Sequence, residues 1–187
     1  MLDHKIILVG CILMASNLAW AEKSEIIAQE DSPIKITAFT ANHKDSITLN
    51  PDGSLNRQAF RELLEYGDAY KTEKIFYKVS VSNTSGKNIV AYRVGIATFG
   101  VFNNIITKFG GISSEGVSAN GTETARFAND AYAAFRFKKY GTGVAYVDAV
   151  RFEDGTIWRA DMAKILNELK KYQKDLKPED LEEKEKK

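Results

Sequence analysis

The sequence predicts a mainly β protein, built as a β-sandwich with one amphipathic helix close to its C-terminal end. Short runs of alternating apolar and polar residues recur along the chain, and residue pairs typical of tight turns separate them. Helical periodicity is confined to two short stretches, and no regular alternation of strand and helix is present. Many short strands without βαβ units are typical of sandwiches rather than of α/β folds.

The first 21 residues have the layout of a secretory signal peptide. A short charged start precedes an apolar stretch over residues 6–15, and Ala19-Trp20-Ala21 matches a small-residue cleavage site. A transmembrane helix needs about 20 apolar residues, so this stretch is too short to span a bilayer. We expect a mature chain that begins at Glu22 and is periplasmic or secreted.

Cys11 offers a second interpretation of the same leader. Leu8-Val9-Gly10-Cys11 resembles the lipobox of bacterial lipoproteins, in which the cysteine is acylated. The apolar run continues beyond Cys11, however, and this favours cleavage after Ala21. Cys11 is the only cysteine, so cleavage there leaves a mature chain that cannot form a disulfide and depends on its core for stability.

We expect one domain after the leader. Residues 22–33 carry few large apolar side chains and are predicted to be a flexible leader, residues 34–177 to be the sandwich with its C-terminal helix, and residues 178–187 to be a charged disordered tail. The chain has 26 Lys and Arg against 25 Asp and Glu, a formal net charge of +1. That balance gives no reason to expect a nucleic-acid surface.

In the first half of the domain, alternation predicts a strand from Ile34 to Ala38 and a second at residues 46–49. Asn50-Pro51-Asp52-Gly53 is a strong turn signal. The apolar spacing after Ser54 predicts a short helix over residues 55–65, with Ser54 as its N-cap.

The middle of the chain carries the clearest strand signals. An alternating pattern over residues 75–82, with Ile75, Tyr77, Val79 and Val81 on one face, precedes the turn sequence Asn83-Thr84-Ser85-Gly86-Lys87. Residues 88–102 are apolar at both odd and even positions, which predicts a central strand with both faces covered. Residues 108–121 are rich in Gly and Ser and have no sustained period, so we expect mostly loop there.

The last part predicts further strands and then a helix. Alternation returns over residues 123–127 and 131–137, and residues 144–152 form a strand that Asp154-Gly155 connects as a hairpin to residues 156–159. Asp161 is a natural N-cap. The stripe after it, which we expect to pack against the domain's own strands, consists of Met162, Ile165, Leu166, Leu169, Tyr172 and Leu176.

The run YKVSVSNTSGKNIVAYRVGIATFGVFNN, residues 77–104, resembles the bacterial immunoglobulin-like sandwich modules known as FxLYD or DUF4352-like. The run YVDAVRFEDGTIWRAD, residues 146–161, resembles a strand, hairpin and tryptophan ending of exported proteins. Phe99-Gly100-Val101-Phe102 stands where such modules often have an aromatic residue followed by Asp. The resemblance implies an immunoglobulin-like, envelope-associated and non-enzymatic module, and it transfers no active site.

Residue types for catalysis or metal binding are scarce. His43 is the single histidine of the mature chain and lies in a polar, turn-like stretch, which argues against a catalytic triad and a zinc site. A hydrolase would need a carboxylate pair. The candidates for it are Glu115, Glu123, Asp148, Glu153 and Asp154. Asp148 interrupts an apolar strand, so it is either buried with a partner such as Arg151 or Arg159, or placed at a strand end or bulge.

Aromatic residues near the C-terminal end are the best candidates for a binding surface. Most of them must fill the core, but a subset on an outer face would bind a partner. The candidates are Tyr132, Tyr140, Tyr146 and Trp158. We therefore expect a non-catalytic interaction module that binds an envelope protein or surface partner and needs no cofactor. The alternatives are a carbohydrate-binding module and an envelope-polymer hydrolase that uses a carboxylate pair.

Overall fold

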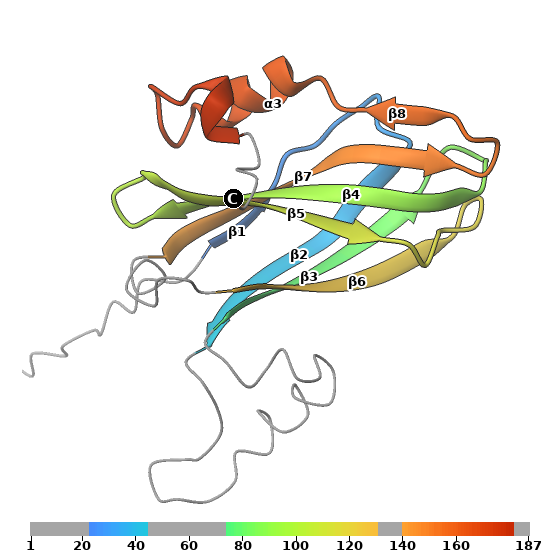
Figure 1. The fold of residues 1–187 in the computed structure, drawn as a ribbon, viewed down its shortest axis with the longest axis horizontal. Helices are drawn as coiled ribbons and strands as arrows, with labels where there is room; N and C mark the ends of the chain where they lie inside the picture. The colour runs from blue at the N-terminus through green and yellow to red at the C-terminus, as the bar shows by residue number, and fades with distance from the viewer. Residues whose placement is uncertain (1–22, 45–73, 131–139, 182–187) are drawn as a thin grey trace, which may run out of the picture.

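A computed structural model describes residues 23–44, 74–130 and 140–181 of the 187-residue chain (Figure 1). The described part is mainly β, as predicted, and has two sheets and one α-helix. Its elements are β1 (Lys23–Ile26), β2 (Ile34–Lys44), β3 (Lys74–Asn83), β4 (Ile89–Gly100), β5 (Ile105–Ser113), β6 (Thr122–Asp130), β7 (Tyr140–Phe152), β8 (Ile157–Arg159), α3 (Met162–Leu169) and a 3-10 helix, η2 (Pro178–Leu181). Within these residues, no helix is both long and apolar enough to cross a membrane.

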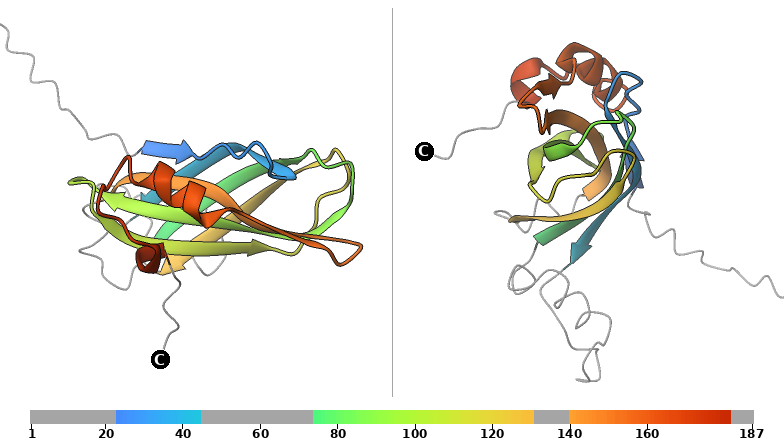
Figure 2. Two further views of the ribbon diagram at one scale, coloured as in Figure 1. Left: turned by 90° about the horizontal axis from the view of Figure 1, so that it is seen from above. Right: turned by 90° about the vertical axis from the view of Figure 1, so that its right-hand side faces the viewer.

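The two sheets face each other and enclose the main core. One sheet has the strand order β1-β7-β4-β5, with β8 also paired to β7, and the other has the order β2-β3-β6. Figure 2 shows the two layers from the end, with α3 and η2 stacked outside the first sheet. Ile75, Tyr77, Val79 and Val81 of β3 are fully buried between the layers, as their alternation predicts.

The turn after β3 is held by Asn83, whose side chain is almost completely buried. Its amide nitrogen donates to the carbonyl oxygens of Lys87 (2.7 Å) and Val117 (3.1 Å), and its Oδ1 accepts from the Ser85 backbone nitrogen (3.0 Å). Gly86 adopts φ +69°, which glycine tolerates without strain. The predicted turn over residues 83–87 is therefore confirmed.

Strand β4 is covered on both faces over most of its length. The apolar residues at both its odd and its even positions predict this. All seven residues from Val94 to Gly100 are buried. Val94 and Ile96 face the main core, whereas Ala97 and Phe99 belong to a second cluster beneath α3. A strand of this kind needs apolar residues at successive positions.

The helix begins where the sequence predicts and buries the predicted face. Asp161 caps α3 by accepting from the Ala163 backbone nitrogen at 3.0 Å, and Ile165 and Leu169 are buried in the second cluster. Its side chains thus pack on the domain's own sheet. The helix ends at Leu169, however, and the chain continues through turns to η2, where Leu181 is also buried in this cluster. The expected tail of residues 178–187 therefore needs correction, since residues 178–181 are part of the fold.

The expected flexible leader also contains structure. Lys23–Ile26 pairs in parallel with β7, from Lys23 opposite Thr142 to Ile26 opposite Ala145. The Gln29 side chain then continues this edge, because its amide donates to the Val147 carbonyl oxygen (2.9 Å) and accepts from the Val147 nitrogen (2.8 Å). Backbone pairing and the Gln29 amide attach this segment to β7. Neither interaction requires a hydrophobic pattern, so no sign of it appears in the sequence.

Residues 108–121 are mostly loop, as predicted, because the connection after Ser113 takes up the larger part of this stretch, but β5 extends into it through Ser113. The Phe127 ring lies so close to Gly111 that a Cβ at this position would be 2.8 Å from the ring. The glycine that suggested a loop therefore serves close packing within a strand.

Several predictions fall outside the described residues. These are the signal peptide, the strand at residues 46–49, the helix over residues 55–65, the strand at residues 131–137 and the end of the charged tail.

Candidate functional site

The outer face of the β1-β7-β4-β5 sheet has a covered half and an uncovered half. In the covered half, Ala97 and Phe99 of β4 and Val144 and Tyr146 of β7 are buried beneath α3 and η2. The Tyr172 ring, from the turns after α3, stacks on Phe99 with a centroid separation of 5.0 Å. This half is part of the core.

The uncovered half is set by the strand register. Arg159 of β8 lies opposite Ala149 of β7, and Ala149 lies opposite Arg93 of β4. Arg93 in turn lies opposite Ile112 of β5. In the neighbouring row, Arg151 lies between Ile157 and Ala91. We call this surface the arginine face, and it comprises Ala91, Arg93, Ile112, Ala149, Arg151, Ile157 and Arg159.

Three arginines surround Ala149 on the arginine face. Strands lie about 4.8 Å apart and rise about 3.3 Å per residue, so the backbones of Arg93 and Arg159 are roughly 10 Å apart and that of Arg151 is about 7 Å from Ala149. The short side chains of Ala91 and Ala149 leave a shallow hollow of about 200 Å³ between them. Ile112 and Ile157, which are 67% and 51% exposed, stand at its two sides.

Asp148 lies next to the arginine face and is 7% exposed. Its Oδ2 forms an ion pair with Nε of Arg93 at 2.5 Å. The register between β4 and β7 shifts at this point, so Asp148 occupies a β-bulge. Both sequence interpretations of Asp148 thus hold in part, but its partner is Arg93 on the neighbouring strand rather than Arg151 or Arg159.

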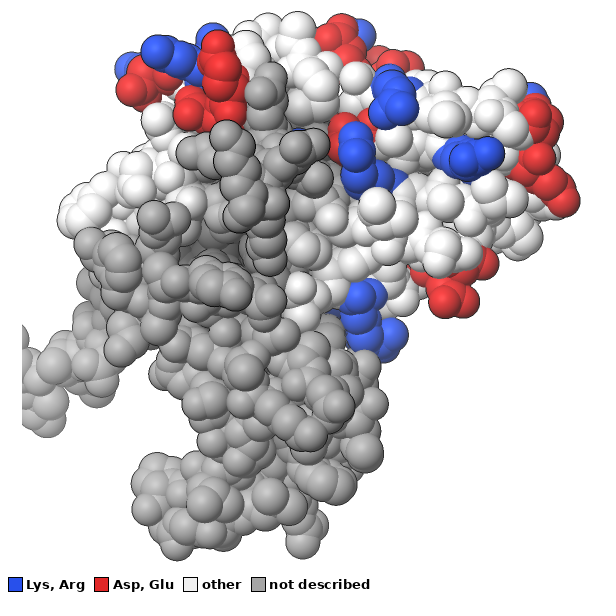
Figure 3. All heavy atoms as spheres, viewed as in Figure 1, with Lys and Arg blue, Asp and Glu red and all other residues white. Residues whose placement is uncertain are grey.

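The two remaining arginines lack such a partner. Arg151 and Arg159 are exposed, and neither forms an ion pair within residues 23–44, 74–130 and 140–181. In Figure 3, blue spheres lie among white ones over the region where Figure 1 places β4, β7 and β8, while red spheres gather mainly at the outline. The arginine face is therefore a basic surface interspersed with apolar side chains.

A deeper hollow of about 410 Å³ adjoins the arginine face at Arg93. Its walls are mostly apolar and come from α3 and η2, and we call it the α3 hollow. Its lining residues are Arg93, Lys108, Asp148, Met162, Ala163, Leu166, Pro178 and Leu181. Leu166 and Met162 are only half-buried, so apolar surface is accessible beside the basic surface.

The aromatic residues that the sequence singles out do not form one surface. Tyr146 is fully buried beneath α3, which removes it from any outer platform, and its ring lies against Gly95. Trp158 is half-buried and packs against the core between the sheets. Tyr140 begins β7 opposite Gly100, and Tyr132 lies outside the described residues.

The candidate carboxylates are distributed over different elements and have local partners. Glu123 of β6 accepts from the Ser113 hydroxyl at 2.8 Å, and Glu153 accepts from the Asn88 amide at 3.0 Å. Near Glu123, burial raises the pKa of the Tyr92 phenol, and the Glu123 carboxylate raises it further. Glu115 is exposed in the connection between β5 and β6. Among the described residues, no three His, Cys, Asp or Glu side chains gather as metal ligands would.

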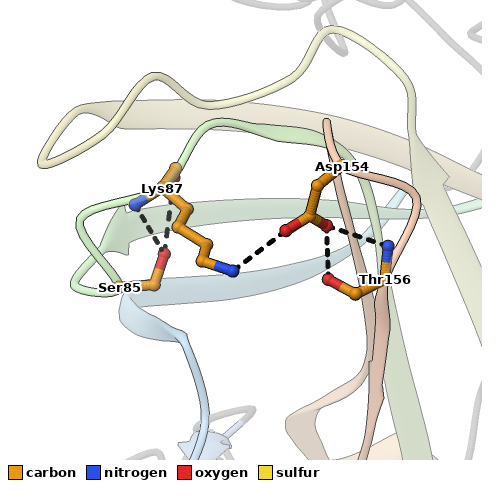
Figure 4. A network of polar contacts seen from close by, with 4 residues as sticks. All are labelled: Ser85, Lys87, Asp154 and Thr156. Carbon is orange, nitrogen blue, oxygen red and sulfur yellow. Dashed lines mark hydrogen bonds and ion pairs between the residues drawn. The ribbon is translucent and has the colours of Figure 1, made fainter.

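Asp154 belongs to the hairpin turn that the sequence predicts between β7 and β8 (Figure 4). Its Oδ1 accepts from the hydroxyl (2.5 Å) and backbone nitrogen (2.9 Å) of Thr156, and its Oδ2 lies 2.9 Å from the Lys87 Nζ. These Thr156 and Lys87 contacts hold the pKa of Asp154 well below its usual range. The local contacts of Asp154 thus explain its position in the turn.

His43, expected near a turn, lies in β2 opposite Ile75.

Sequence reasoning missed the arginine face as a candidate site. Part of it could have been found, because the Asp154-Gly155 hairpin sets Arg151 opposite Ile157 and places Arg159 on the same face. The place of Arg93 on this face could not have been found in the same way. Its position relative to Ala149 depends on the register across two strands and on the bulge at Asp148.

Comparison with known proteins adds no family. No family model and no curated protein matches the chain. Two solved structures resemble it at 10% sequence identity. One is a hypothetical protein from Peptoclostridium difficile 630, with a TM-score of 0.48, covering 77% of this chain and 93% of that one. The other is a Northeast Structural Genomics Consortium target, with a TM-score of 0.36, covering 68% of this chain and 80% of that one.

Proposed function

We propose that this protein is a non-catalytic interaction module that is exported to the periplasm or cell surface and binds an envelope protein through the arginine face. The observation that carries this proposal is the contrast on one sheet face, half of which is buried beneath α3 while the other half exposes three arginines with Ile112 and Ile157. At the finer level, we assign the fold to the immunoglobulin-like sandwiches that the resemblance of residues 77–104 implies.

The composition of the arginine face supports a protein partner. Arginine is enriched in protein interfaces, where its planar guanidinium can hold two acceptor atoms and also stack on flat groups. Isoleucines at the two sides supply apolar area, and the alanine floor lets a partner's side chain approach the sheet. The four strands that carry the arginine face, β4, β5, β7 and β8, are hydrogen-bonded in one sheet. The surface is therefore rigid before binding and loses little conformational freedom.

Site-specific photo-crosslinking in the native host tests this role. A photoreactive amino acid at Ile112 or Ile157 should give a discrete protein adduct, whereas the same group at Thr37, exposed on β2 of the other sheet, should not. Arg151→Gln with Arg159→Gln should remove the adduct, and Lys174→Gln, an exposed control, should keep it. Adducts with polysaccharide alone would favour the carbohydrate-binding alternative and contradict the proposal.

Export is tested separately by the intact mass of the protein from the envelope fraction. The leader predicts a chain that starts at Glu22 and carries no lipid. A diacyl mass on Cys11 would instead make the protein a membrane-anchored lipoprotein.

A further inference from the structure

We propose that the partner of the arginine face is an acidic protein segment with one large apolar side chain, whose carboxylates bind the arginines while the apolar side chain enters the α3 hollow. This inference rests on the proposed protein-binding role and specifies its chemistry. It joins two surfaces that meet at Arg93, which lines both the shallow hollow and the α3 hollow.

The first step of the argument is charge. Around Ala149 the face carries Arg93, Arg151 and Arg159, and Asp148, a carboxylate beside them, is already paired with Arg93. Lys108 adds a fourth cation at the α3 hollow. Complementary charge across an interface increases the association rate and excludes wrong partners. A segment with at least two carboxylates therefore matches this surface.

The second step is the shape and lining of the α3 hollow. Its volume of about 410 Å³ exceeds that of one large side chain, and Met162, Leu166, Pro178 and Leu181 give it apolar walls. Burial of an apolar side chain there would remove its surface from water and so favour binding. Side chains that fill pockets dominate the binding free energy of many interfaces. We therefore expect the partner to offer an apolar side chain for the α3 hollow as well as carboxylates for the arginines.

The third step distinguishes a protein from an anionic polymer or lipid surface. A phosphate-rich ligand would gain from the arginines but would leave Ile112 and Ile157 in contact with charged groups. Both isoleucines flank the shallow hollow and are more than half exposed. A peptide that alternates acidic and apolar side chains can satisfy both kinds of residue at once.

Selection from a random peptide library displayed on phage tests the proposal, with the mature chain as the target. Selected peptides should be enriched in Asp and Glu and should share one large apolar residue. Arg151→Gln with Arg159→Gln should remove the acidic enrichment, and Ala163→Phe, which fills the α3 hollow, should remove the apolar preference. A representative peptide should lose at least about tenfold in affinity with either variant, and Lys174→Gln should leave its affinity unchanged. Each variant is first shown to unfold at the parent's temperature.

The outcomes separate this inference from the proposed function. Selected peptides without acidic residues, or with unchanged affinity for the Arg151→Gln, Arg159→Gln chain, would overturn the inference. Stronger binding to vesicles of anionic phospholipid than to any selected peptide would also overturn it. If photo-crosslinking at Ile112 captures a protein whose linked segment is not acidic, the proposed function stands and only the chemistry assigned here fails.

Discussion

The two halves of the outer sheet face use the same strands for opposite purposes. On β4, Ala97 and Phe99 lie beneath the C-terminal segment, whereas Ala91 and Arg93 lie on the arginine face. On β7, Val144 and Tyr146 are buried, and Arg151 is exposed. The boundary between the halves coincides with the bulge at Asp148, which changes the register of β7 against β4. One face of the sheet is therefore buried at one end and exposed to solvent at the other.

The largest effect is expected where a charge enters the covered half. Leu169 is fully buried in the cluster beneath α3, so Leu169→Asp should lower the free energy of unfolding by several kcal/mol. Asn167→Asp introduces the same group two residues earlier, at an exposed position of α3, and is the matched control. Urea denaturation measures both. Equal stability of the two variants would show that α3 is not packed on the sheet.

The boundary itself should respond to loss of the buried carboxylate. Asp148→Ala removes the partner of Arg93, whose side chain is 36% exposed, so solvent partly compensates its charge. We expect a loss of about 1–3 kcal/mol. Adding Arg93→Ala to Asp148→Ala should recover part of this loss, because the unpaired cation is then absent. If the loss in free energy of unfolding for the double variant equals the sum of the losses for the two single variants, the two residues are not coupled.

A smaller, pH-dependent effect is expected at the exposed Asp154. Its pKa in the folded chain lies below the ordinary value of 3.8 because of the Thr156 and Lys87 contacts. The carboxylate therefore stabilises the fold above its unfolded pKa, and this contribution is lost as the pH falls through the folded pKa. Asp154→Asn should be less stable than the parent at neutral pH and equal to it in strong acid. Thermal unfolding across this range measures the difference, and a gap that widens toward acid would contradict it.

The smallest effect on stability is expected on the uncovered half. Arg151→Glu reverses an exposed charge that has no ionic partner among the described residues, so the free energy of unfolding should change by less than about 0.5 kcal/mol. The same denaturation measurement that reports Leu169→Asp applies here. A loss comparable to that of Leu169→Asp would mean that the arginine face is structural rather than a binding surface.

The comparison also shows what kind of feature the sequence could predict. The double parity of β4, the turn at Asn83 and the cap at Asp161 are local patterns, and each was predicted correctly. Strand β1 depends on backbone pairing with residues more than 100 positions away, so composition alone suggested a loose leader. The arginine face arises from register between distant strands and from a bulge. Single-sequence patterns do not contain that information.

Gln29 has a consequence for the behaviour of the protein at high concentration. Its amide occupies the backbone groups of Val147 in the gap between β1 and β8, where Ile27 donates to Ala145 on one side and Ala160 donates to Asp148 on the other. Without this amide, a central strand would present an open donor and acceptor to neighbouring molecules, and such edges promote aggregation. Gln29 therefore closes the stretch of the β7 edge that neither β1 nor β8 pairs, and this removes one place at which a neighbouring chain could form backbone hydrogen bonds.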